Sequence, residues 1–203
     1  LFEESVRKYP NNTFLLEKTG KQFEPTTYAQ TQTQVYRIGA GLQALGVQKG
    51  DTMALLSEGR NMWVMGELGM FYAGAVNVPL SIKLEESNDL LFRLLHGDVK
   101  YVMVSGTQLG KIRAIKDKLT LVEKVIVFDA QQTYEEKEMS LDELLQMGDD
   151  FLSSHTEEEF LKVAKKFPEV KPIIGCEVYV TKHYDHKLKD KDHRAYFHLI
   201  LLA

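Results

Sequence analysis

The fold of this chain is constrained most strongly by short apolar segments that alternate with segments of helical periodicity. The apolar segments lie at 52–57, 75–79, 101–104 and 125–128. The segments between them repeat apolar residues at helical spacing and cover 61–73, 85–96 and 107–119. Strands that are apolar at nearly every position are typical of parallel sheets covered by helices on both faces. The sequence therefore predicts an α/β fold with a largely parallel sheet and flanking helices.

Further helices are predicted from their start and stop signals. Residues 1–10 form a short helix that ends at Pro10, and residues 28–45 form a longer helix with Gly46 as its C-terminal cap. Asn61 is expected to cap the helix at 61–73. Two capping boxes predict helices that start at Ser140 and Thr156 and run to about residues 152 and 167. Strands follow at 172–180 and 196–202, joined by a charged loop.

Composition excludes several classes of protein. The net charge of −4 gives no basic surface for nucleic acid over the whole chain. A single cysteine excludes an internal disulfide framework and fits a reducing compartment, so a cytoplasmic location is expected. No apolar run approaches the roughly 18 residues that span a bilayer, and no signal peptide is found. The start lacks Met and the chain stops inside the apolar run FHLILLA, so we expect a fragment.

Motifs for catalysis and phosphate binding are weak. The segment Gly106–Ile112 differs from a Walker A loop by one residue in its spacing, and Ile112 stands where the Mg²⁺-binding Ser or Thr belongs. Neither G-x-G-x-x-G nor G-x-S-x-G occurs in the sequence. The helix at 61–73 is apolar on almost every side, which is typical of a core helix. No catalytic or cofactor-binding residue is predicted.

Several segments in order resemble one enzyme family. The run SEGRNMWVMGELGMFYAGAVNVPL from Ser57, with KGD upstream and VEKVIVFD downstream, resembles the N-terminal region of AMP-forming acyl-CoA synthetases. Long-chain fatty-acid ligases are the most similar subgroup. The resemblance covers residues 1–155 and implies a truncated N-terminal subdomain of the ANL type.

The family resemblance implies a reaction in which a fatty acid is activated by ATP and Mg²⁺ and then captured by coenzyme A. In that family the phosphates are held by a loop of TSGTTGxPKG type. Later segments contribute a Tyr-Gly-x-Thr-Glu motif, an adenosine-binding Asp and a lysine. None of these motifs is present in this sequence. The chain is therefore expected to be inactive by itself, and no catalytic residue is transferred to it.

Residues 156–203 resemble a different family. The segments KPIIGCEVYV and HLILLA resemble part of the PHP domain of a bacterial DNA polymerase III α subunit, with a short βαβ-like fold. In that family the matching positions, Glu177 and His198, are candidate ligands of Zn²⁺, Mn²⁺ or Fe. The H-x-H and DHG segments that complete such a cluster are absent. His183, Asp185, His186 and His193 are interpreted as a solvated loop, and Cys176 as a small buried residue.

Three functions follow from these resemblances. The first is an inactive fragment of a fatty-acid–CoA ligase, joined near residues 155/156 to a foreign segment in a chimera. The second is a metal-binding PHP fragment linked to nucleic-acid chemistry. The third is a non-catalytic interaction fragment that self-associates through exposed sheet edges. A contact with a membrane surface cannot be detected from the sequence, and nothing in it directly indicates a nucleic-acid partner.

Overall fold

A computed structural model describes the backbone of residues 1–165, 175–181 and 196–202. The chain divides into two compact units, Leu1–Lys166 and Phe167–Ala203. The first unit holds the central sheet, and we describe each unit by itself.

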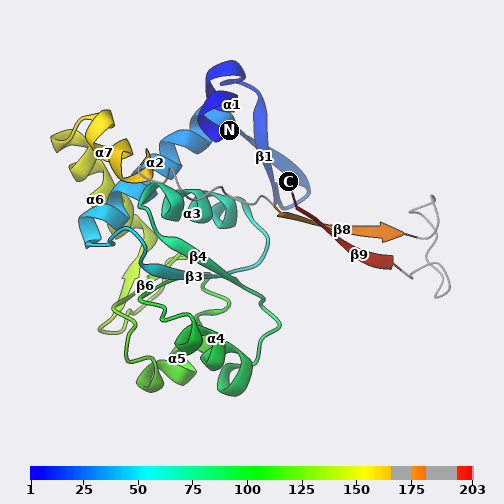
Figure 1. The fold of residues 1–203 in the computed structure, drawn as a ribbon, viewed down its shortest axis with the longest axis vertical. Coiled ribbons are helices and arrows are strands. Elements are labelled where there is room, and N and C mark those ends of the chain that lie inside the picture. The colour runs from blue at the N-terminus through cyan, green and yellow to red at the C-terminus, as the bar shows by residue number, and fades with distance from the viewer. Residues whose placement is uncertain (166–174, 182–195, 203) are drawn as a thin grey trace. The chain divides into compact units, whose positions relative to one another are not determined.

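The central sheet of the first unit has five parallel strands, as the sequence predicts (Figure 1). Its strands are β3 (Thr52–Leu56), β4 (Val76–Leu80), β5 (Tyr101–Val104), β6 (Lys124–Val127) and β7 (Glu138–Ser140). Their order across the sheet is β4–β3–β5–β6–β7. The sequence analysis did not predict the short edge strand β7.

Helices cover both faces of this sheet, which explains why β5 is buried at every position. The helices of the first unit are α1 (Phe2–Lys8), α2 (Tyr28–Leu45), α3 (Asn61–Tyr72), α4 (Leu91–His96), α5 (Leu109–Ile115), α6 (Leu141–Ser154) and α7 (Glu157–Lys165). A π-helical turn, η1 (Glu86–Leu90), precedes α4, and a 3₁₀ turn, η2 (Lys116–Lys118), follows α5.

Alternate residues of the inner strands β3 and β5 enter two separate cores. Met53 and Leu55 of β3 pack in a cluster with residues of α2, α3 and α6. Ala54 and Leu56 pack in a second cluster with residues of α4 and α5. Figure 1 shows α3 on one side of β3 and β4, and α4 and α5 on the other. The apolar character of these two strands follows from the two cores.

The ends of α2 match the prediction. Thr27 accepts a hydrogen bond from the Gln30 amide while the Gln30 side chain accepts one from the Thr27 amide, so the helix begins with a capping box. Gly46 follows the last turn with φ 103°, a left-handed conformation that favours glycine. Along the helix, Val35, Ile38 and Leu42 are fully buried.

An antiparallel hairpin precedes α2 and was not predicted from the sequence. Its strands are β1 (Thr13–Thr19) and β2 (Gln22–Thr27), joined through Gly20 at φ 63°. On one face of the hairpin, Leu16 and Phe23 are 60% and 63% exposed. The strands therefore lack the clean alternation of buried and exposed residues that reveals a strand in sequence.

Helices α6 and α7 begin where the two capping boxes predict. Ser140 and Glu143 exchange hydrogen bonds at the start of α6, and Thr156 and Glu159 do so at the start of α7. Phe160 of α7 is fully buried in the first unit. The predicted division at residues 155/156 thus falls between two helices that both belong to the first unit.

The second unit contains β8 (Gly175–Thr181) and β9 (Tyr196–Leu202). These two strands pair antiparallel. The prediction of a βαβ-like fold for this segment is therefore wrong, because a βαβ unit requires parallel strands. Both predicted strands are present.

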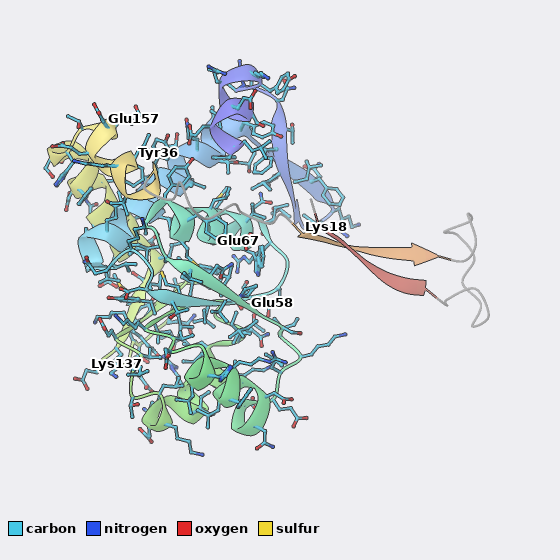
Figure 2. The ribbon with its side chains drawn as sticks, in the orientation of Figure 1. Lys18, Tyr36, Glu58, Glu67, Lys137 and Glu157 are labelled. Carbon is cyan, nitrogen blue, oxygen red and sulfur yellow. The ribbon has the colours of Figure 1, made fainter. Side chains whose placement is uncertain are left out.

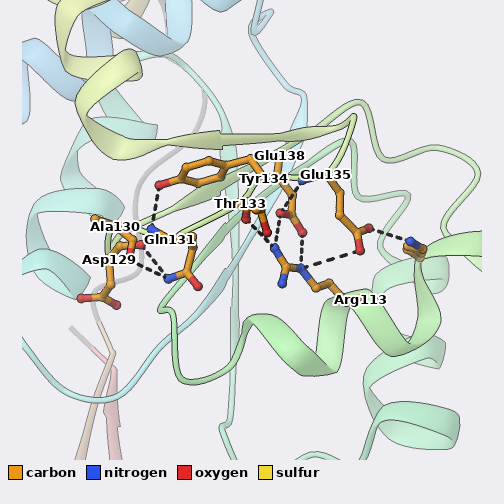
Figure 3. A network of polar contacts seen from close by, with 9 residues as sticks. Arg113, Asp129, Ala130, Gln131, Thr133, Tyr134, Glu135 and Glu138 are labelled. Atoms are coloured by element: carbon orange, nitrogen blue, oxygen red, sulfur yellow. Dashed lines mark hydrogen bonds and ion pairs between the residues drawn. The ribbon is translucent and has the colours of Figure 1, made fainter.

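The loop between β6 and β7 is fixed by polar contacts (Figure 3). Arg113 of α5 donates from Nε and Nη2 to the two carboxylate oxygens of Glu138, at 2.8 and 2.6 Å. Arg113 Nη2 also donates to the Thr133 carbonyl oxygen. The Glu138 side chain is only 5% exposed. The hydrogen bonds from Arg113 hold the pKa of Glu138 below its ordinary value, and burial opposes this effect.

Glu138→Gln is expected to lower the free energy of unfolding by about 1–2 kcal/mol at pH 7. Because the folded-state pKa of Glu138 is depressed, its contribution is present above the unfolded-state pKa, about 4.3, and is lost as the pH falls through the folded-state pKa. Urea unfolding at several pH values between 7 and 3 should show the two proteins converging at acid pH. Glu136→Gln is the matched control, since the Glu136 side chain is exposed and forms no ion pair with any residue that the structure describes. A constant difference at all pH values would contradict the assignment.

Candidate functional site at the carboxyl edge of the sheet

The strand order makes the chain leave the carboxyl ends of β3 and β5 in opposite directions. From β3 the chain enters α3 on one face of the sheet, and from β5 it enters α5 on the other face. In open parallel sheets, ligands bind where neighbouring connections diverge in this way. The residues that directly follow these strands therefore form the candidate site.

Polar residues stand at these strand ends. Ser57 and Glu58 follow β3, and Ser105 and Gln108 follow β5. Figure 2 labels Glu58. Ser105 is fully buried and Gln108 is 7% exposed. Gln108 Nε2 donates to Glu58 Oε1 at 2.5 Å, so its amide oxygen faces away, and that oxygen is buried without a hydrogen-bond partner in the described part of the chain. An unsatisfied buried acceptor is available to a ligand or water that donates a hydrogen bond.

The Glu58 carboxylate is held ionised. Burial raises its pKa, but the hydrogen bond from Gln108 and the nearby charge of Arg60 outweigh burial and lower the pKa below its usual range. The carboxyl edge of the sheet therefore holds a fixed negative charge beside the amide of Gln108.

A second group of contacts ties three strand ends together. Arg60 Nη1 donates to both oxygens of Asp129, at 2.8 and 3.0 Å, and the Gly106 amide donates to Asp129 Oδ2 at 2.7 Å. Burial raises the pKa of Asp129, but these hydrogen bonds outweigh burial and lower it. A Cβ at Gly106 would lie 2.7 Å from Gln131 Nε2 and 3.1 Å from Asp129 Cβ, so a larger residue would require the Gln131 side chain to shift. These contacts fix the turn between β5 and α5.

Asn61 does not have its predicted role in this region. Arg60 occupies the N-cap position of α3 and makes no side-chain capping hydrogen bond. Asn61 is the first helical residue, and its Nδ2 donates to Thr26 Oγ1 of the hairpin at 3.3 Å. The side chain of Asn61 therefore joins α3 to β2.

These groups are suited to binding more than to covalent chemistry. Fixed carboxylates, a guanidinium group, a buried amide and a glycine turn can hold and orient a polar ligand. No group of three or more His, Cys, Asp or Glu residues that could hold a metal is found among the described residues. None of these residues was given a functional role from the sequence, although a polar residue directly after each apolar strand is a visible signal.

The predicted metal pair lies in the second unit. Along the antiparallel ladder Glu177 pairs with Ile200, whereas His198 pairs with Tyr179. The two positions are thus not paired with each other and stand two residues apart along the ladder. Their side chains, and the whole loop with His183, Asp185, His186 and His193, lie outside what the structure describes. The metal site stays a prediction.

The family of the chain is shown by comparison with known proteins. A family model described as AMP-binding enzyme matches residues 2–196. The chain belongs to the family of AMP-binding enzymes. Long chain acyl-CoA synthetase 8 of Arabidopsis thaliana is 25% identical over 193 residues, which cover 86% of this chain and 26% of that protein. A long-chain-fatty-acid–CoA ligase of Xenopus laevis is 24% identical over 162 residues, covering 78% of this chain and 22% of that ligase.

Solved structures of this family share the fold of the chain. A long-chain-fatty-acid–CoA ligase of Archaeoglobus fulgidus aligns with a TM-score of 0.63 at 18% identity, over 72% of this chain and 29% of that one. An anthranilate–CoA ligase in complex with anthranoyl-AMP aligns with a TM-score of 0.63 at 22% identity, over 71% of this chain and 27% of that one. The predicted α/β fold with a parallel sheet flanked by helices is confirmed.

The matches also bear on the rest of the sequence interpretation. The chain spans about a quarter of the length of the long-chain ligases that it matches. The family model extends to residue 196 and so includes most of the segment that resembles a PHP domain. The comparisons give no support to that resemblance or to a chimera. None of the helices that the structure describes has the length and apolar character needed to span a membrane.

Proposed function

We propose that this chain forms part of an ATP-dependent, AMP-forming acyl-CoA ligase whose acid substrate is a fatty acid. The observation that carries the proposal is the family match over residues 2–196. In the proposed reaction, the carboxylate of the acid attacks the α-phosphate of ATP, which gives an acyl-adenylate and pyrophosphate. The thiol of coenzyme A then captures the acyl group and releases AMP. Mg²⁺ would neutralise the phosphates during transfer.

The fatty-acid class is supported by how far the relatives align. The two long-chain ligases align over 78% and 86% of this chain. A 4-coumarate–CoA ligase of Arabidopsis thaliana aligns over only 53%. The longer alignments favour a long acyl chain over an aromatic acid.

The described residues would contribute the carboxyl edge of the sheet to this activity. Glu58, Gln108 and the fixed turn at Gly106 lie where a parallel sheet of this order binds ligands. The printed sequence contains no loop of the TSGTTGxPKG type, which in this family holds the phosphates. We therefore propose that these 203 residues provide a scaffold and form no acyl-adenylate by themselves.

Exchange of radiolabelled pyrophosphate into ATP tests the inactivity. With palmitate and Mg²⁺, the purified chain is expected to give the same exchange as a sample without acid. An intact long-chain acyl-CoA ligase at equal concentration serves as the positive control. Acid-dependent exchange that rises with the concentration of the chain would contradict the proposed inactivity.

The coding DNA that flanks this chain tests the ligase assignment separately. A continuation into a TSGTTG-type segment in the same reading frame is expected. A continuation into polymerase sequence would overturn the assignment and support the hypothesis of a chimera instead.

A further inference from the structure

A cavity of about 780 Å³ lies at the amino-terminal edge of the sheet. It is formed by α5, the 3₁₀ turn η2 and the residues at the starts of β6 and β7. Because the strands are parallel, this edge is opposite to the carboxyl edge that holds Glu58 and Gln108. The volume falls within the range of roughly 300–1,000 Å³ that is typical of small-molecule sites. The cavity shares no residue with the candidate site described above.

The floor of this cavity is apolar. Ile112, Leu119, Val122 and Val125 line it, and each of them is at most 5% exposed. These side chains belong to the core on the α4 and α5 face of the sheet. A ligand that reaches them would remove its own apolar surface from water, which favours a ligand with a hydrocarbon body.

The cationic groups of the lining are already occupied. Arg113 is bound to Glu138, as the dashed lines in Figure 3 show. Lys116 Nζ lies 2.7 Å from Glu135 Oε2. Lys137 Nζ donates to the Val122 carbonyl oxygen at 2.6 Å. An anionic ligand would have to compete with these internal contacts. The cavity is therefore poorly suited to a phosphate or carboxylate.

Two carboxylates of the lining are unpaired. Asp117 and Glu136 line the cavity, and neither side-chain carboxylate makes a hydrogen bond or a close ion pair within the described part of the chain. Lys124 Nζ donates to the Glu136 carbonyl oxygen at 3.5 Å, and the charge of Asp117 acts on Lys116 without a direct contact. The lining thus carries four carboxylates against three cationic groups. A divalent metal is disfavoured, since the described residues offer no group of three suitable ligands. The class of ligand that remains carries a single positive charge on an apolar body.

We propose that this cavity binds a small organic ammonium ion. The ammonium group lies at the rim beside Asp117 and Glu136, and the hydrocarbon part covers the floor at Val122 and Val125. This binding is independent of the proposed ligase reaction, because it uses none of the residues at the carboxyl edge.

Hexylammonium is the probe, and 1-hexanol and hexanoate are the matched neutral and anionic probes. Titration followed by backbone amide chemical shifts is expected to give saturable changes at the lining residues, with a dissociation constant on the order of 1 mM. Asp117→Asn and Glu136→Gln should each weaken hexylammonium binding roughly threefold, and the double variant about tenfold, as exposed ion pairs permit. 1-Hexanol should bind the unaltered chain about tenfold more weakly than hexylammonium, and hexanoate more weakly still.

Both substitutions replace exposed side chains whose carboxylates make no hydrogen bond within the described residues, so the fold is expected to remain intact, which an unchanged melting temperature would verify. Glu158→Gln, an exposed change on α7, is the control for a general loss of negative charge and should leave the dissociation constant unchanged. Three outcomes would each overturn the proposal: no saturable shift at 20 mM hexylammonium, equal binding of 1-hexanol, or unchanged binding in the double variant.

Discussion

Gly148→Ala is expected to lower the free energy of unfolding of the first unit by about 3 kcal/mol. Gly148 of α6 faces α2, where a Cβ would clash with the carbonyl oxygen of Arg37. A Cβ at Gly41 of α2 would likewise clash with the carbonyl oxygen of Leu144. Arg37 also donates to both carboxylate oxygens of Asp149 at 2.6 Å, which holds the two helices in this register. An added methyl group must therefore push the helix backbones apart, because backbone atoms cannot rotate out of its way.

The only tryptophan of the chain, Trp63 of α3, packs against the core beside these helices. Its fluorescence during urea unfolding therefore reports on the first unit. Gly110→Ala is the matched control, since Gly110 also lies in a helix but has open space around its Cβ position. This control is expected to gain roughly 0.5–1 kcal/mol from helix propensity. If Gly148→Ala proved as stable as Gly110→Ala, the close packing of α2 and α6 would be refuted.

The close packing of α2 and α6 is a feature of the fold that could not be predicted from the sequence. The strands β3, β5 and β6 could be predicted, because burial on both faces requires apolar residues at nearly every position. The start and stop of α2 could be predicted because its caps are local. The contact of Gly148 with α2 could not, since it joins residues more than a hundred positions apart and depends on how the two helices cross.

The candidate site was missed for a related reason. Glu58, Gln108 and Asp129 are ordinary polar residues in sequence, and only the strand order brings them to one edge of the sheet. The order cannot be read from the alternation of strands and helices alone, because several orders share the same alternation. The resemblance to a PHP domain instead selected Glu177 and His198 as site residues, and the comparisons offer no support for that resemblance.

Phe160→Ala is expected to lower the free energy of unfolding of the first unit by about 3–5 kcal/mol. The Phe160 ring is fully buried, with its centroid 5.2 Å from that of Tyr36 and 6.0 Å from that of Tyr72. Gln43 Nε2 donates to the Phe160 carbonyl oxygen at 3.3 Å and so links α2 to α7. Removing the ring leaves a cavity between three helices that cannot close without moving them.

The same substitution tests the division predicted at residues 155/156. If a separate segment began there, Phe160 would contribute little to unfolding that Trp63 detects, and a chain ending at residue 155 would be as stable as the whole. The buried ring predicts the opposite, namely that both changes destabilise the first unit to a similar extent. Phe92→Ala is the control, because Phe92 is 63% exposed and its loss should cost under about 1 kcal/mol. If the Phe160→Ala chain were as stable as the Phe92→Ala chain, α7 would have to be assigned to the separate segment that was predicted to begin at residue 156.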